Sequence, residues 1–81
     1  MSPPVLTAYL RNGCSLCEAM LEELTPYQRQ YGFRTESVDI DRSPELVRRY
    51  GERVPVLVGG EQEICHYFLD PEALRRYFAP L

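Results

Sequence analysis

The spacing of apolar and polar positions changes along this chain, and each change predicts an element. Residues 5–10 form a short apolar run rich in β-branched side chains, which predicts a buried strand. From Ser15 on, apolar residues recur at helical spacing, as on one face of a helix. They are Leu16, Met20 and Leu24, with Cys17 and Leu21 on the adjoining row. The first part of the chain therefore predicts a strand, a tight loop and a helix.

The sequence also predicts where this helix ends and where the next strand lies. We expect the helix to lose its regularity at Pro26, because proline has no N–H to donate and its ring clashes with the preceding turn. Residues 27–31 then continue as a kinked or separate turn, which Gly32 ends. Residues 33–40 alternate in character and predict a second strand, and their polar content favours an edge position.

Two later segments share one helix-start signal, an N-cap residue followed by proline and glutamate. These segments are Ser43-Pro44-Glu45 and Asp70-Pro71-Glu72. The helix that starts at Pro44 is short and ends at Gly51. The apolar faces are Leu46, Val47 and Tyr50 in the first helix, and Ala73, Leu74, Tyr77 and Phe78 in the second.

Between these helices, residues 54–58 and 61–68 are β-prone runs joined by Gly59-Gly60, which predicts a hairpin with a two-glycine turn. The predicted order is β-α-β-α-β-β-α. The first two strands should pair in parallel through a right-handed crossover, whereas the hairpin is antiparallel. The expected fold class is α/β, with a four-stranded mixed sheet flanked by helices in a single domain over residues 1–81.

Composition and charge narrow the function classes. The chain has 81 residues, of which 44% are hydrophobic and 26% charged, as in an ordinary soluble domain. Nine arginines, no lysine and a net charge of −3 form no basic stripe, so we expect no nucleic-acid partner. The first apolar run is too short for a signal peptide or a membrane span. We expect a cytoplasmic monomer that does not bind a membrane.

Cys14 and Cys17 stand between the first strand and the first helix. Cys14 falls at the helix N-terminus, where unpaired N–H groups and the helix dipole stabilise a thiolate, so it is the predicted nucleophile. Cys17 lies nearly one turn later on the same side, within reach of a disulfide, and is the predicted resolving thiol. Gly13 supplies a permissive turn residue. A C-x-x-C pair in this context predicts a redox site.

The alternative for this pair is half of a zinc site. Such a site needs four ligands, and the remaining candidates are Cys65 and His66. Adjacent residues on a strand point to opposite faces, so they would not converge on one ion, and we expect no metal. We interpret Cys65 as a small buried hydrophobe rather than a third catalytic thiol. His66 is a lone histidine that either titrates near the site or has no role there.

Arg11 lies two residues before Gly13. Its guanidinium could stabilise a thiolate or a substrate carboxylate, and it could equally be a solvated loop residue. The sequence leaves both interpretations open.

The chain resembles the glutaredoxin branch of the thioredoxin-like superfamily, most closely the small bacterial glutaredoxin-like proteins with a Gly-Cys-x-Leu-Cys signature. The segments that carry the resemblance are Cys14-Ser15-Leu16-Cys17, Arg53-Val54-Pro55 and Gly59-Gly60. Ser15 and Leu16 stand where glutaredoxins commonly have proline and tyrosine, and Ile64-Cys65-His66 replaces a second glycine pair.

The resemblance implies a thioredoxin-like fold in which Pro55 follows a cis peptide bond beside the cysteines and Val54 offers its backbone to the substrate. Together with the residues around Cys14, the candidate substrate-binding residues are Arg11, Gly13, Ser15, Val54 and Pro55.

The resulting hypothesis is a small thiol-disulfide oxidoreductase without a tightly bound cofactor, which uses Cys14 and Cys17 to reduce disulfides through a mixed-disulfide intermediate. Its partner would be a disulfide-containing protein or a glutathione mixed disulfide, with glutathione or a thioredoxin-type system as reductant. The alternative is a non-catalytic thioredoxin-fold binding module, or a carrier of glutathione or an iron–sulfur cluster. The second cysteine favours the oxidoreductase.

Overall fold

The computed structural model describes residues 2–80 and confirms the predicted order of helices and strands. One short 3₁₀ turn, η1, is added after the second strand. The elements are β1 (Val5–Leu10), α1 (Ser15–Tyr31), β2 (Arg34–Asp39), η1 (Ile40–Arg42), α2 (Pro44–Tyr50), β3 (Val56–Gly59), β4 (Gln62–His66) and α3 (Pro71–Phe78). None of the helices in this part of the chain is long and apolar enough to cross a membrane.

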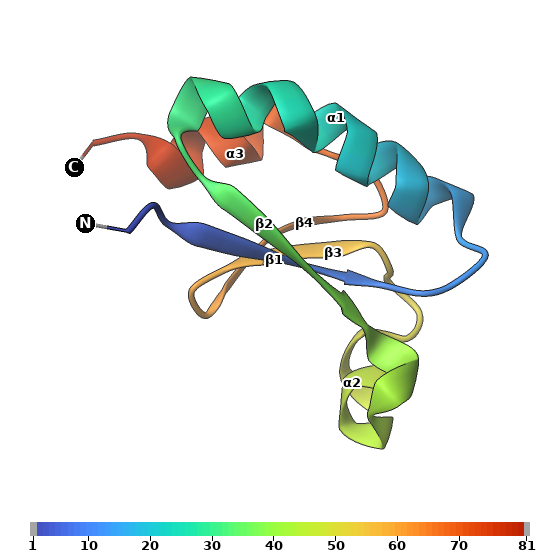
Figure 1. Ribbon diagram of the computed structural model, residues 1–81. Coiled ribbons are helices and arrows are strands. Elements are labelled where there is room, and N and C mark those ends of the chain that lie inside the picture. The colour runs from blue at the N-terminus through green and yellow to red at the C-terminus, as the bar shows by residue number, and fades with distance from the viewer. Residues whose placement is uncertain (1, 81) are drawn as a thin grey trace.

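The four strands form one mixed sheet in the order β2-β1-β3-β4, which confirms the edge position of β2. β1 pairs in parallel with β2 and antiparallel with β3, and β3 and β4 form the antiparallel hairpin. Helices α1 and α3 cover one face of the sheet, whereas α2 lies below the other face near one end (Figure 1). The molecule is therefore an α/β sandwich of the thioredoxin type.

The alternation of β1 divides the apolar residues into two clusters. Leu6 and Ala8 are fully buried under α1 and α3, whereas Tyr9 packs against the cluster beside α2. The first cluster contains Leu6, Ala8, Met20, Leu24, Phe33, Leu57, Ile64 and Leu74. The second contains Ile40, Tyr50, Val56 and Val58.

The apolar face of α1 differs from the predicted one at its first residue. Cys17, Met20 and Leu24 are buried, but Leu16 is exposed. In the first turn the next residue, Cys17, takes the buried position, so the buried row of α1 begins at Cys17 and Leu16 lies to one side of it. The prediction that Leu16 belongs to the core row is wrong.

Helix α1 also runs unbroken through Pro26 to Tyr31, which corrects the expected loss of regularity. Proline in a helix costs about 3 kcal/mol, partly through a lost backbone hydrogen bond. Packing on both sides of Pro26 offsets this cost, because Leu24 before it and Tyr27 and Tyr31 after it all pack against the first cluster. Gly32 ends the helix in the left-handed conformation, with φ of 72°, as predicted.

The hairpin turn lies one residue later than predicted. Gly59 still pairs with Gln62, so the turn consists of Gly60 and Glu61. A Cβ at position 59 would lie 2.5 Å from the Tyr77 hydroxyl, so this strand position has room only for glycine. Gly60 takes the positive φ of the turn, 61°.

Strand boundaries were predicted less well than strand identity. The third strand begins at Val56 rather than at residue 54, and the fourth ends at His66 because Tyr67 adopts a left-handed conformation. Ile40 leaves the second strand and is buried in η1. The consequence for the site is that Val54 and Pro55 lie in a loop before β3.

Helix α3 starts at the predicted cap, and this contact can be tested. Asp70 Oδ1 accepts hydrogen bonds from the N–H groups of Glu72 (3.1 Å) and Ala73 (3.2 Å). We expect Asp70→Ala to lower the free energy of unfolding by about 1 kcal/mol, since these donors lose their acceptor. Asp70→Asn keeps an acceptor and is the control. Urea unfolding of the three proteins measures the difference; equal midpoints for Asp70→Ala and wild type would contradict the capping role.

Candidate active site

The two cysteines occupy the positions that the sequence predicts. Cys14 is the N-cap of α1, directly after Gly13, whose φ of 70° makes the turn from β1 into the helix. Cys17, in the first turn, is only 3% exposed. Their Cα atoms are 5.2 Å apart and their sulfurs form a disulfide. The pair thus closes a disulfide within one helical turn.

The helix N-terminus acts directly on the first sulfur. Cys14 Sγ accepts a hydrogen bond of 3.1 Å from the N–H of Cys17. This N–H is one of the unpaired donors at the start of α1, and its hydrogen bond favours negative charge on the sulfur when the disulfide is open. Of the two sulfurs, it is thus Cys14 Sγ that accepts a hydrogen bond from the helix N-terminus.

A cavity of about 320 Å³ lies beside the pair, between α1 and the edge strand β2. It contains both cysteines, and its remaining walls include Arg11, Gly13, Glu18, Leu21, Ser37 and Asp39. Sequence reasoning missed the contribution of β2. The sequence shows a carboxylate, Asp39, directly after the apolar Val38. Only the parallel pairing of Leu10 with Asp39 places this carboxylate beside the cysteines.

The Arg11 guanidinium forms its hydrogen bonds with Asp41 and Gly51 and not with the cysteine sulfurs. It donates to Asp41 Oδ1 from Nε (3.1 Å) and from Nη2 (3.0 Å), and Nη1 donates to the Gly51 carbonyl at 3.4 Å. Arg11 lines the cavity and is about one third exposed, so neither predicted alternative describes it fully. Its contacts tie the loop after β1 to η1 and to the end of α2.

Val54 and Pro55 lie just before β3, on the side of β1 opposite to β2, and they do not line this cavity. The peptide bond between them is cis, in agreement with the expectation, and Pro55 is fully buried. Tyr9 pairs with Val56, so the loop that ends at Pro55 lies beside the loop that begins at Arg11. Among residues 2–80, no backbone hydrogen bond outside the helices and strands involves Val54.

Ser15, the remaining predicted substrate residue, is the exposed first residue of α1 and does not line the cavity. The structure therefore brings Gly13 and Arg11 together with the cysteines in one cavity, whereas Val54 and Pro55 lie outside it, before β3.

Cys65 and His66 do point to opposite faces of the sheet. Cys65 packs against the first cluster, whereas His66 lies on the other face, where its Nδ1 is 2.8 Å from Glu63 Oε2. Within residues 2–80, no three His, Cys, Asp or Glu side chains come together as a metal site would require. Cys65 is free and half-buried.

The reactivity of Cys65 gives a second test. Burial raises the pKa of this thiol; a backbone hydrogen bond from Asp70 lowers it, and the Asp70 and Glu63 carboxylates raise it further, so that the pKa lies above its ordinary value. In a Cys14→Ser/Cys17→Ser double variant, we expect iodoacetamide to alkylate Cys65 more slowly at neutral pH in the folded protein than in urea. Mass spectrometry follows the reaction. Equal rates in the two states would show that Cys65 is not protected.

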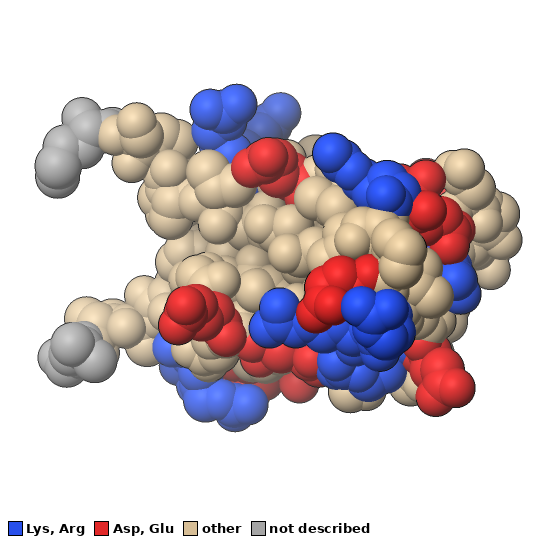
Figure 2. Space-filling model, turned by 90° about the horizontal axis from the view of Figure 1, so that it is seen from below, with Lys and Arg blue, Asp and Glu red and all other residues tan. Residues whose placement is uncertain are grey.

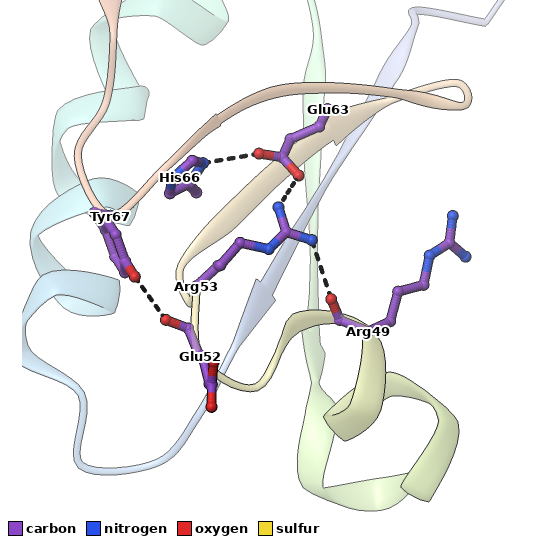
Figure 3. A network of polar contacts seen from close by, with 6 residues as sticks. All are labelled: Arg49, Glu52, Arg53, Glu63, His66 and Tyr67. Atoms are coloured by element: carbon purple, nitrogen blue, oxygen red, sulfur yellow. Dashed lines mark hydrogen bonds and ion pairs between the residues drawn. The ribbon is translucent and has the colours of Figure 1, made fainter.

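Figure 3 shows a polar network around the loop before β3 that the sequence did not reveal. Glu63 on β4 contacts both Arg53 and His66, and Arg53 Nη2 donates to the Arg49 carbonyl at 3.0 Å. Burial raises the pKa of Glu63, but the hydrogen bonds from Arg53 and His66 lower it by more, so its pKa is below the ordinary value. Glu63 therefore remains a carboxylate that holds the loop to the hairpin.

A larger cavity, of about 520 Å³, lies on the α2 side and contains neither cysteine. Its walls include the stacked rings of Tyr9 and Tyr50 and the side chains of Arg53 and Glu63. Figure 2 shows this face of the molecule, where basic and acidic side chains lie next to one another rather than in patches of one sign. This cavity therefore lies apart from the cysteine pair.

Comparison with known proteins agrees with this geometry. The glutaredoxin-like domain family (DUF836) matches residues 5–79. Protein Ne2328 from Nitrosomonas europaea, known from a solution NMR structure, is 41% identical over 98% of this chain and 95% of its own, with a TM-score of 0.86. Protein XcR50 from X. campestris is 37% identical over 93% of this chain and 99% of its own, with a TM-score of 0.70.

More distant structures share the fold alone. The oxidized form of mitochondrial thioredoxin 3 from Saccharomyces cerevisiae is 22% identical over 96% of this chain and 78% of its own, with a TM-score of 0.63. No curated protein matched the chain. Because the family match spans nearly all the described residues and includes both cysteines, the chain belongs to the glutaredoxin-like domain family, within the thioredoxin-like superfamily.

Proposed function

We propose that this protein is a thiol-disulfide oxidoreductase that reduces disulfides with the Cys14/Cys17 pair. One observation carries the proposal: Cys14 caps α1 and accepts the Cys17 N–H, while the Cys17 side chain is buried one turn later at disulfide distance. A structural disulfide would need neither the helix N-terminus at the first sulfur nor a cavity open to both residues.

The reaction has two exchange steps. In the first, the Cys14 thiolate attacks one sulfur of the substrate disulfide; that bond breaks, and the other substrate sulfur leaves as a thiolate and takes up a proton. In the second, Cys17 loses its proton and its sulfur attacks Cys14 Sγ. The mixed disulfide breaks, the second substrate thiol leaves, and the Cys14–Cys17 disulfide remains. Two electrons have passed from the dithiol to the substrate.

The substrate in this proposal is a disulfide-containing protein or a glutathione mixed disulfide. Val54, whose backbone has no partner within its own loop, is positioned to pair with an extended segment beside the substrate disulfide. Gly13, Ser15 and Arg11 lie on the loop and the helix start around Cys14. The carrier alternative has less support, since the second cysteine occupies a buried position suited to resolving an adduct.

The reductant decides the class of oxidoreductase. The test is to follow NADPH oxidation with a peptide disulfide as substrate in two coupled assays, one with glutathione and glutathione reductase and one with a thioredoxin reductase. We expect turnover in at least one of them. A protein that is fully reduced by dithiothreitol yet reduces no disulfide in a single turnover would overturn the proposal.

A further inference from the structure

Tyr67, directly after β4, holds an unusual backbone conformation. Its φ is 64°, and it is the one residue other than glycine with a positive φ among residues 2–80. A bulky side chain rarely adopts this conformation, because its Cβ approaches the backbone too closely. Where such a residue persists, the surrounding contacts hold it, and such residues gather at active sites and ligand clamps. The contacts of Tyr67 therefore require an explanation.

Two hydrogen bonds run from Tyr67 to the loop that contains Val54. Its N–H donates to the Pro55 carbonyl at 2.9 Å, and its phenolic O–H donates to the Glu52 carbonyl at 2.7 Å. Figure 3 shows the ring reaching from the end of β4 to the Glu52 backbone. One residue thus holds both ends of residues 52–55.

Burial does not account for this arrangement. Tyr67 is 40% exposed, and the aromatic contact of its ring is an edge-to-face arrangement with His66, also exposed, at 4.8 Å. A tyrosine that served only the core would bury its ring. The two hydrogen bonds to the loop are therefore what this strained, exposed residue contributes.

The rest of the loop is fixed from the side of α2. The Arg53 N–H donates to the Tyr50 carbonyl at 2.9 Å, and the Arg53 guanidinium contacts Glu63 and the Arg49 carbonyl. Glu52, Arg53 and Pro55 are thus all held by hydrogen bonds, whereas Val54 between them has no backbone partner among the residues that the structure describes. A loop fastened on both sides of one free peptide group presents that group in a fixed direction.

We propose that Tyr67 is a positioning residue: its hydroxyl fixes the loop so that the Val54 backbone is ready to pair with the extended chain beside a substrate disulfide. This inference rests on the proposed function and deepens it, because it assigns a residue that would favour disulfides within a polypeptide backbone over small disulfides. A small disulfide without a peptide backbone has nothing to pair with Val54. Tyr67 should therefore matter for peptide disulfides and not for small ones.

The test compares Tyr67→Phe with wild type. The variant keeps the ring and the N–H contact and removes only the hydroxyl. The reduced protein is mixed with a synthetic peptide that carries one internal disulfide, or with bis(2-hydroxyethyl) disulfide, and single turnovers are quenched and analysed by mass spectrometry. Tyr27→Phe, which removes a hydroxyl from a half-buried tyrosine near the other end of α1, is the matched control.

For Tyr67→Phe we expect the half-saturating peptide concentration to rise about three- to tenfold, as for the loss of one hydrogen bond, with little change in the maximal rate. The rate with bis(2-hydroxyethyl) disulfide should not change. Exchange of the Arg53 amide hydrogen, which lies next to the released Glu52 carbonyl, should become faster by a similar factor. Tyr27→Phe should match wild type in all three measurements.

The outcomes separate this inference from the proposed function. If wild type reduces both disulfides and Tyr67→Phe does so with unchanged half-saturation, Tyr67 is not a positioning residue and the oxidoreductase remains. Equal losses with both substrates would also overturn the inference, because they would indicate a general structural role. If wild type reduces neither disulfide, the proposed function is wrong and the inference falls with it.

Discussion

Replacing Cys14 by serine is expected to lower disulfide reduction by at least about a thousandfold, to the rate without protein, as for the loss of an enzymatic nucleophile. A serine hydroxyl is not ionised at neutral pH and forms no stable adduct with a disulfide sulfur. The measurement is the rate of peptide disulfide reduction by pre-reduced protein, together with a search for covalent adducts by mass spectrometry.

This substitution separates chemistry from folding. Cys14 is an N-cap residue whose Sγ accepts the Cys17 N–H, and serine is among the best N-cap residues, so Cys14→Ser keeps an acceptor at this position. Urea unfolding of the reduced proteins should therefore show little difference from wild type. Cys65→Ala is the control for the number of thiols and should retain activity. Wild-type rates in Cys14→Ser would mean that another thiol attacks the substrate.

The predictable part of this fold is the part that local physics determines. Gly32 ends α1 with a positive φ, and Ser43 and Asp70 cap α2 and α3, where the sequence places them. Each signal depends on a few neighbouring residues, so it can be recognised without knowledge of the rest of the chain. The parallel pairing of β1 with β2 follows from the helix that joins them, since a helical crossover is the usual connection between parallel strands.

The sequence predictions are wrong where residues far apart in the chain determine the local structure. Pro26 alone predicts an interruption, but aromatic residues beyond it pack against a core that the local sequence does not show. Gly59 and Gly60 both suit a turn, but Gly59 pairs with Leu6 and Gln62 in the sheet, where the Tyr77 side chain from α3 packs against it. In both cases tertiary packing overrides a local preference.

The candidate site divides in the same way. The cysteine pair was predicted from its spacing and context, because the helix N-terminus and the x₂ separation are local. The assignment of Val54 and Pro55 to the site came from the resemblance and not from their chemistry. The ion pair of Arg11 with Asp41 joins residues 30 positions apart, and the sequence offered no signal for it. Nor does a tyrosine in the left-handed conformation have a sequence signature, so Tyr67 was missed.

Replacing Cys17 by serine is expected to give a different result from Cys14→Ser. The mixed disulfide with the substrate should form, but its resolution by residue 17 should stop. Cys14 keeps its hydrogen bond in this variant, because the donor is the backbone N–H of residue 17 and not its side chain. Formation of the mixed disulfide should thus keep its rate within about a factor of two, since one neutral contact at most is altered. The adduct then persists, because the buried thiol that would resolve it is gone.

Mass spectrometry after mixing Cys17→Ser with glutathione disulfide should show one glutathione per protein, located on Cys14 by peptide mapping. Multiple turnover should fall to background without added thiol and return only as reduced glutathione is added, since glutathione can attack the adduct from outside. The rise of the rate with glutathione concentration measures how open Cys14 is to a second thiol. An adduct located on Cys65, or full turnover by Cys17→Ser without glutathione, would show that the roles of nucleophile and resolving thiol are not those of Cys14 and Cys17.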